Sequence, residues 1–177
     1  MNKIWFTSDT HFGSQKTLEL SKRPFKTVEE MDGALIKNWN NTIGKKDIVF
    51  HLGDFGEYER IKELNGITML ILGNYEEIDN KQGTLLLDGF DKVLGRISQV
   101  YFAGRIINLT HEPNKIKNRK IDEKNINLFG HIHKLCMIKP YGLNVGVDCH
   151  DFKPIDLNTI LFYHNAILNH YDEEVFN

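Results

Sequence analysis

The sequence predicts an α/β fold, with strands and helices alternating in the first half and strands dominating the second. Buried-strand patterns at residues 3–8, 47–54 and 67–74 are separated by helical patterns, which favours a layered sheet with helices on its faces. Residues 93–111 read as two or three strands joined by tight glycine turns, without room for a helix. An antiparallel or mixed arrangement is therefore expected in the second half.

The first half contains one strong helix pattern and one weaker pattern. Residues 28–43 carry apolar side chains at helical spacing, with Thr27 as the expected N-cap and Glu30 completing a capping box. Residues 60–65 favour a short helix between two buried strands. Both helices are expected to cover the sheet that the neighbouring strands form.

The second half combines strands, a polar loop and a final helix. Residues 112–124 read as a charged loop, and residues 125–133 and 141–148 read as strands. Pro154 and Asp156 are typical of a helix start, and the apolar spacing behind them predicts a C-terminal helix.

Composition limits the domain organisation, location and partners. The 177 residues show no repeat or linker, so one domain spanning residues 1–177 is expected. A net charge of -2 gives no bulk attraction to nucleic acid or membranes, so neither is a favoured partner. Cys136 and Cys149 lack metal-ligand spacing and cannot form a disulfide framework. With no signal region or apolar span, a cytoplasmic protein is expected.

Side chains of metal-ligand type follow the predicted strands. They are Asp9, His11, Asp54, Asn74, His111, His131 and His133. Because ligands gather beyond the carboxyl ends of strands in open α/β sheets, these side chains are expected to converge. The donor set suits divalent Mn, Fe, Co, Ni or Zn, and it is too large for a single catalytic zinc. Two divalent ions sharing a carboxylate are therefore expected, and such a pair supports phosphate ester hydrolysis.

The motifs that hold these side chains resemble a known family. SDTH at 8–11, LGD at 52–54, LGN at 72–74, TH at 110–111 and GHIH at 130–133 look like the calcineurin-like metallophosphoesterase superfamily. The match is ordered and spans the chain, and the closing NVGVD and FKPIDLNTI resemble small bacterial and phage members. The resemblance implies a four-layer α/β/β/α sandwich of two mixed sheets flanked by helices, with a two-metal centre.

The resemblance also implies a role for each ligand. The first metal would be bound by Asp9, His11, Asp54 and His133, with Asp54 bridging, and the second would be completed by Asn74, His111 and His131. Asn74 would be a neutral oxygen ligand that limits negative charge where phosphate approaches. A hydroxide bridging the two ions would attack phosphorus, with manganese as the expected metal and Fe, Zn, Ni or Co as alternatives.

Tyr75 departs from the family pattern. The family usually has a histidine after the asparagine, which contacts the scissile phosphate and protonates the leaving group, whereas Tyr75 and Glu76 follow Asn74 here. A phenol with a pKa of about 10 is a weaker acid at neutral pH than an imidazole at about 6.5. Relatives with cysteine at this position tend to favour phosphodiesters. We therefore expect Asn74 and Tyr75 to act in a phosphodiesterase for a small or nucleotide-like diester.

Several alternatives accompany this expectation. A phosphomonoesterase or a nuclease of the same superfamily is the main rival, and a noncatalytic scaffold is less favoured because every ligand position is filled. His51 and His150 could orient ligands or could be buried, hydrogen-bonded residues. The cationic loop at 112–124 could guide a phosphate-rich substrate, although a solvated loop is the simpler interpretation. Specificity is expected in this loop and in those at 12–26 and 55–60.

Overall fold

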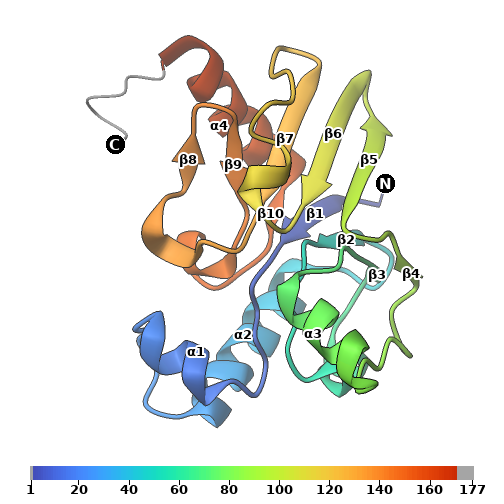
Figure 1. The fold of residues 1–177 in the computed structure, drawn as a ribbon, viewed down its shortest axis with the longest axis vertical. Helices are drawn as coiled ribbons and strands as arrows, with labels where there is room; N and C mark the ends of the chain where they lie inside the picture. Colours follow the sequence, from blue (N-terminus) through green and yellow to red (C-terminus); the bar gives the residue numbers. More distant parts are fainter. Residues whose placement is uncertain (1, 171–177) are drawn as a thin grey trace.

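The structure, a computed structural model, describes residues 2–170 as two β-sheets with helices around them (Figure 1). In chain order the strands are β1 (Ile4–Thr7), β2 (Ile48–His51), β3 (Ile67–Leu70), β4 (Lys92–Val93), β5 (Ile97–Phe102), β6 (Arg105–Thr110), β7 (Asn125–Phe129), β8 (Ile138–Lys139), β9 (Gly142–Asn144) and β10 (Ile155–Asp156). The sheet orders are β10-β1-β2-β3-β4 and β5-β6-β7-β9-β8. Both sheets mix parallel and antiparallel pairs, so the predicted fold class is confirmed.

The helices include those that the sequence predicts and two that it does not. They are α1 (Gln15–Leu20), α2 (Val28–Thr42), α3 (Asn74–Gln82) and α4 (Leu157–His170), with short 3-10 turns η1 (Tyr58–Glu63), η2 (Pro113–Lys115), η3 (His133–Leu135) and η4 (Val147–Cys149). Thr27 caps α2 as predicted by accepting the Glu30 N–H at 3.2 Å. The second bond of the expected capping box is shifted by one residue, because the Glu30 carboxylate accepts the N–H of Lys26 at 2.8 Å in place of the N–H of Thr27. No helix within residues 2–170 is long and apolar enough to cross a membrane.

Two helices form where the sequence shows no helical periodicity. Helix α1 lies within the segment 12–26, which the sequence predicts to be a loop, and only its Thr17 and Leu18 are buried. Helix α3 follows the LGN motif, and its one buried residue is Glu76. Helices this short or this polar present no continuous apolar stripe, so the spacing of hydrophobic residues does not reveal them.

The two sheets pack against each other through one apolar core. Phe6 of the first sheet and Leu128 of the second belong to the same buried cluster. Side chains alternate along each strand, so the neighbouring Trp5 points to the opposite face and packs with Trp39 of α2. Helix α4 contacts β1 and β10 of the first sheet and β8 and β9 of the second. This helix therefore ties the two sheets together.

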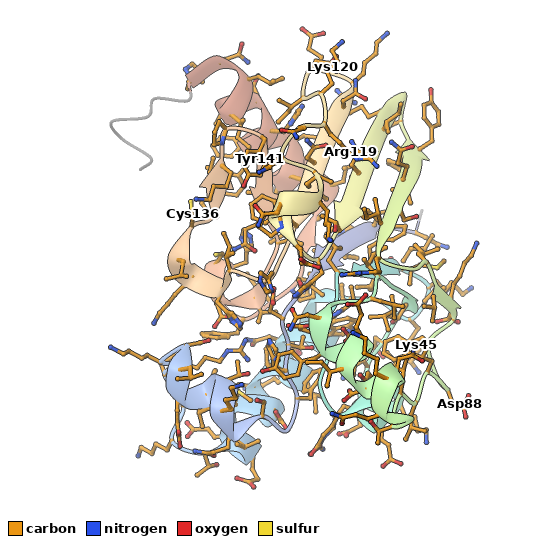
Figure 2. The ribbon with its side chains drawn as sticks, in the orientation of Figure 1. Lys45, Asp88, Arg119, Lys120, Cys136 and Tyr141 are labelled. Atoms are coloured by element: carbon orange, nitrogen blue, oxygen red, sulfur yellow. The ribbon has the colours of Figure 1, made fainter. Side chains whose placement is uncertain are left out.

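The charged segment 112–124 folds against the second sheet. Ile116 is fully buried, and Arg119 donates a hydrogen bond to Asn108 Oδ1 at 2.9 Å. Figure 2 shows Arg119 and Lys120 at the end of the molecule that β6 and β7 occupy, opposite α1. The segment is thus part of the cover over this sheet.

Truncation of the α4 residue that enters the core should weaken the fold. We expect Ile160→Ala to lower the free energy of unfolding by about 2–5 kcal/mol, because the Ile160 side chain is fully buried in the shared core. Phe162→Ala is the matched control on the same helix, since Phe162 is 70% exposed. Urea unfolding measures both changes, and equal losses would contradict this role for α4.

Candidate metal centre

The side chains expected to bind metal lie beyond the carboxyl ends of neighbouring strands. Asp9 and His11 follow β1, Asp54 follows β2, Asn74 follows β3, His111 follows β6, and His131 and His133 follow β7. Strands β1, β2 and β3 run parallel, as do β6 and β7, so the strand ends within each sheet point the same way. The structure brings these side chains together, as the sequence predicts.

The ligand-type atoms form two adjacent groups, each with all its atoms within 4.8 Å of one another. One group is Asp9, His11 and His133, and the other is Asp54, His111 and His131. Asn74 joins the second group, because its Oδ1 lies 3.0 Å from His111 Nε2 and 2.9 Å from His131 Nδ1. The first group holds three of the four residues that the family resemblance implies for the first ion, and Asp54, the fourth, lies in the second group with His111 and His131.

Asp54 lies between the two groups. Its Oδ2 is 3.5 Å from His11 Nε2 and 3.2 Å from His111 Nε2. The other oxygen, Oδ1, accepts the backbone N–H of Tyr75 at 3.0 Å. A carboxylate that faces an imidazole of each group is placed as a bridging ligand of two cations would be.

Backbone strain is concentrated at the candidate ligand positions. Positive φ angles occur at Asp9 (58°), His11 (49°), Asp54 (56°), His131 (75°) and His133 (47°). Each such residue costs on the order of 1–3 kcal/mol relative to an unstrained backbone, and strain of this kind clusters at functional sites. The surrounding fold therefore holds these side chains in place at the expense of local stability.

Two motif glycines allow the carboxylates to approach the backbone closely. A Cβ on Gly73 would collide with Asp54 Oδ1, and a Cβ on Gly130 would collide with Ser8 Oγ and Asp9 Oδ2. The glycines of LGN and GHIH are therefore needed for the packing of the two site carboxylates.

The electrostatics of the site fit a bound cation. Burial lowers the pKa of His11 to about 4 although Asp9 and Asp54 favour its charged form, so the imidazole is neutral at pH 7. Within residues 2–170, His11 Nε2 is buried and has no hydrogen-bond partner. A neutral imidazole nitrogen left without a partner beside two carboxylates is suited to bind a divalent metal.

His111 differs from His11, because its environment favours the charged imidazole. Burial lowers its pKa, but the hydrogen bond to Asp54 and the charges of Asp9 and Asp54 outweigh burial and raise the pKa to about 9. Its Nδ1 donates to the carbonyl oxygen of Leu52 at 2.8 Å, which leaves Nε2 facing Asp54 and Asn74. The two carboxylates thus attract a proton where a cation could bind.

Glu76 supports the site in a way that sequence reasoning missed. Its buried carboxylate accepts the backbone N–H groups of Asp54 at 2.9 Å, Phe55 at 2.8 Å and Gly73 at 2.8 Å. These bonds tie the LGD turn to the start of α3, so Glu76 positions both Asp54 and Asn74. Its place three residues after Gly73, near a helix N-terminus, is the signal that could have revealed this role.

Arg23 and Asp148 form a second support, also missed from the sequence. Arg23 donates to Asp148 through Nε at 2.9 Å and Nη2 at 2.8 Å, and to the carbonyl oxygens of Asp9 and Thr10. Asp148 Oδ2 lies 2.8 Å from His133 Nδ1. The carboxylate therefore orients the His133 ring, as carboxylates commonly do for metal-binding histidines.

His51 and His150 lie outside the two ligand groups and are hydrogen-bonded. His51 Nδ1 accepts the N–H of Gly53 at 3.3 Å, Nε2 lies 3.0 Å from Thr10 Oγ1, and burial lowers its pKa to about 3. His150 Nε2 donates to the carbonyl oxygen of Asn144 at 2.8 Å. Both residues are therefore buried, hydrogen-bonded histidines, which is the second of the two interpretations offered by the sequence. His51 also holds the backbone turn before Asp54 through its bond to Gly53.

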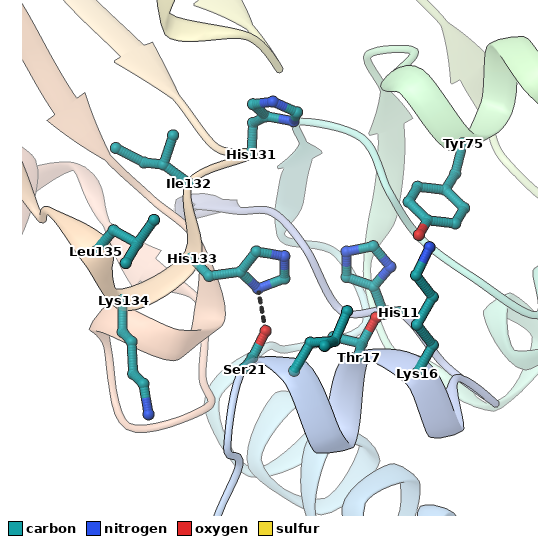
Figure 3. Close-up of a pocket in the computed structure, with 11 residues that line it drawn as sticks. His11, Lys16, Thr17, Ser21, Tyr75, His131, Ile132, His133, Lys134 and Leu135 are labelled. Atoms are coloured by element: carbon teal, nitrogen blue, oxygen red, sulfur yellow. Dashed lines mark hydrogen bonds between the residues drawn. The ribbon is translucent and has the colours of Figure 1, made fainter.

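Tyr75 lies beside the ligands at a pocket of about 410 Å³ (Figure 3). Its ring meets the His11 ring edge-on, with centroids 5.1 Å apart. Lys16 extends from α1 toward Tyr75, with Nζ 5.9 Å from the ring centroid. His11, His131 and His133 also line the pocket, which therefore opens directly onto both ligand groups.

Comparisons with known proteins identify the family and several relatives of this chain. Residues 2–167 match the calcineurin-like phosphoesterase superfamily domain. An uncharacterised protein of Methanocaldococcus jannaschii, MJ1445, is 31% identical over 91% of this chain and 90% of its own length. The gene 66 protein of Mycobacterium phage D29 is 28% identical over 88% of this chain and 94% of its own. A protein of unknown function from Aquifex aeolicus, AQ665, has the same fold, with a TM-score of 0.67 at 23% identity over 90% of this chain and 98% of that one.

The chain belongs to the calcineurin-like phosphoesterase superfamily. The family resemblance that the sequence motifs suggest is thereby confirmed, and with it a metal-dependent phosphoesterase class of enzyme. The candidate ligand groups occupy the five motifs that carry the resemblance.

Removal of the Arg23 charge should destabilise the site. We expect Arg23→Met to lower the free energy of unfolding by about 3–5 kcal/mol, because the buried Asp148 carboxylate loses its guanidinium partner and keeps only the His133 imidazole. Arg96→Met is the matched control, since Arg96 forms exposed ion pairs and its loss should cost less than about 1 kcal/mol. Chemical denaturation measures both variants. A loss no greater than that of the control would contradict the role given to the Arg23–Asp148 pair.

Proposed function

We propose that this phosphoesterase is a phosphodiesterase that uses two divalent metal ions and acts on a small or nucleotide-like diester. The observation that carries the proposal is the position of Asp54 between two ligand groups whose histidines His11, His131 and His133 line one pocket. Membership of the superfamily supports hydrolysis of a phosphoester bond. The diester preference rests on Tyr75.

Each of the two proposed ions would be bound by its own set of side chains. Asp9, His11, Asp54 and His133 would hold the first, and Asn74, His111 and His131, with Asp54 shared, would hold the second. Manganese fits the mixture of carboxylate, amide and imidazole donors, as iron, zinc, nickel and cobalt do. When bound, two such ions supply an activated water and positive charge next to the phosphoryl group.

The residues around the ions prepare the pocket for a phosphate. Asn74 contributes an uncharged oxygen and begins α3, whose N-terminus is the positive end of the helix dipole. Lys16 adds a cation on the Tyr75 side of the pocket. Tyr75 takes the place of the family histidine, and its hydroxyl can donate a hydrogen bond to a phosphate oxygen. As a weak acid it assists an alkoxide leaving group less than imidazolium would.

Loss of the shared carboxylate should abolish activity. We expect Asp54→Asn to lower kcat for bis(p-nitrophenyl) phosphate by more than about a hundredfold and to reduce the bound manganese per chain, because the neutral amide replaces the negative charge that both ions would share. Asp88→Asn, at an exposed carboxylate, is the control and should change neither value. Elemental analysis and steady-state kinetics provide the readouts. Full manganese content and an unchanged rate in Asp54→Asn would refute the assignment.

Tyr75 should set the preference for diesters. The wild-type protein with manganese is expected to hydrolyse bis(p-nitrophenyl) phosphate faster than p-nitrophenyl phosphate. Tyr75→His should raise turnover of an unactivated monoester such as glycerol 2-phosphate by at least about tenfold, because imidazolium can protonate the alkoxide. Tyr75→Phe should give no such gain. A strong monoester preference in the wild type would instead support the phosphomonoesterase alternative.

A further inference from the structure

The pocket beside the metal centre has apolar walls that the metal ligands do not explain. Leu20, the last residue of α1, is 73% exposed, and Leu135, the last residue of η3, is 85% exposed. Both line this pocket together with Ile132. Figure 3 shows α1 and the segment from His131 to Leu135 on different sides of the pocket. A single exposed leucine is ordinary, but two on separate elements at one pocket indicate an apolar binding surface.

The charges around the pocket favour an anionic ligand at one end only. No carboxylate lines it among residues 2–170. Lys16 points toward Tyr75, close to His11. Lys134 is directed elsewhere, because its Nζ donates to the carbonyl oxygen of Lys22 at 3.4 Å. The pocket lining therefore combines a polar part, made by the site histidines and Lys16, with the apolar side chains of Leu20, Ile132 and Leu135.

The size of the pocket limits the ligand. A volume of about 410 Å³ lies at the lower end of the range for small-molecule sites, about 300–1,000 Å³. This space suits one ring system joined to one phosphate. A bound polymer would require a longer basic groove, and the net charge of the chain is -2.

We propose that Leu20 and Leu135 form a subsite for a nucleobase-sized planar ring, so that the substrate is a diester of a single nucleoside. Its phosphate would lie between the histidines and Lys16, and its base would pack between the two leucines. This inference rests on the proposed function, because that function places the phosphate at the ligand groups. It adds the chemical class of the group that is esterified to the phosphate, which the metal centre alone does not define.

Binding to the manganese-loaded full chain tests the subsite without relying on turnover. Adenosine 5′-monophosphate and ribose 5-phosphate share a sugar phosphate and differ by the base, so the ratio of their Kd values in calorimetry reports the base contact. We expect the nucleotide to bind at least about tenfold more tightly. Leu135→Ser and Leu20→Ser should each remove most of this preference without changing the Kd of ribose 5-phosphate. Leu86→Ser is the control, because Leu86 is 57% exposed and lines a different pocket.

The outcomes separate the subsite from the proposed function. Equal affinity for the two ligands, or a preference that both leucine variants retain, would overturn the subsite. If octyl phosphate binds more tightly than the nucleotide, the subsite is for an alkyl group and the proposed ring site is wrong. If a single-stranded oligonucleotide binds more tightly than the nucleotide, the proposal that the substrate contains a single nucleoside is wrong. Hydrolysis of bis(p-nitrophenyl) phosphate in the same preparation reports on the proposed function. Its absence, with the base preference intact, would refute the phosphodiesterase and not the ring site.

Discussion

The carboxylate of Asp54 is the group around which the site is arranged. One of its oxygens faces His11 and His111, which belong to different ligand groups, and the other accepts the N–H of Tyr75. Two site carboxylates, Asp9 and Asp54, are buried beside these imidazoles, and an uncompensated buried charge is strongly unfavourable. The raised pKa of His111 follows from this concentration of negative charge. Burial lowers the pKa of His11, whose Nε2 has no hydrogen-bond partner among residues 2–170. A pair of divalent cations would satisfy all of these groups together.

The fold supports this arrangement through side chains that do not belong to the ligand set. Glu76 binds the backbone around Asp54 and Gly73, and Arg23 links the backbone of Asp9 to Asp148, which orients His133. Backbone strain at five ligand positions requires such support, because each strained residue would otherwise relax. The same turns also bring Tyr75 and α1 to the pocket, so the candidate metal ligands and the proposed specificity residues share one scaffold.

The sequence predicts the longer strands, α2, α4 and the convergence of the ligand-type side chains, because periodicity and strand-end chemistry are local signals. It does not predict the two-residue strands β8 and β10, which are too short to show an alternating pattern. It missed α1 and α3, since Thr17, Leu18 and Glu76 are too few buried residues to define a helical face. It also missed Arg23 and Asp148, which are 125 positions apart in the chain. A buried ion pair between distant residues leaves no pattern in the sequence, and neither does a pocket whose walls come from α1 and η3.

Anomalous diffraction from crystals of the manganese-loaded protein would test the two-ion centre most directly. The expected result is a pair of manganese peaks per chain, one contacting His11 and His133 and the other contacting His111 and His131, with the Asp54 carboxylate touching both. A single peak, or peaks that Asp54 does not contact, would contradict the two-ion centre.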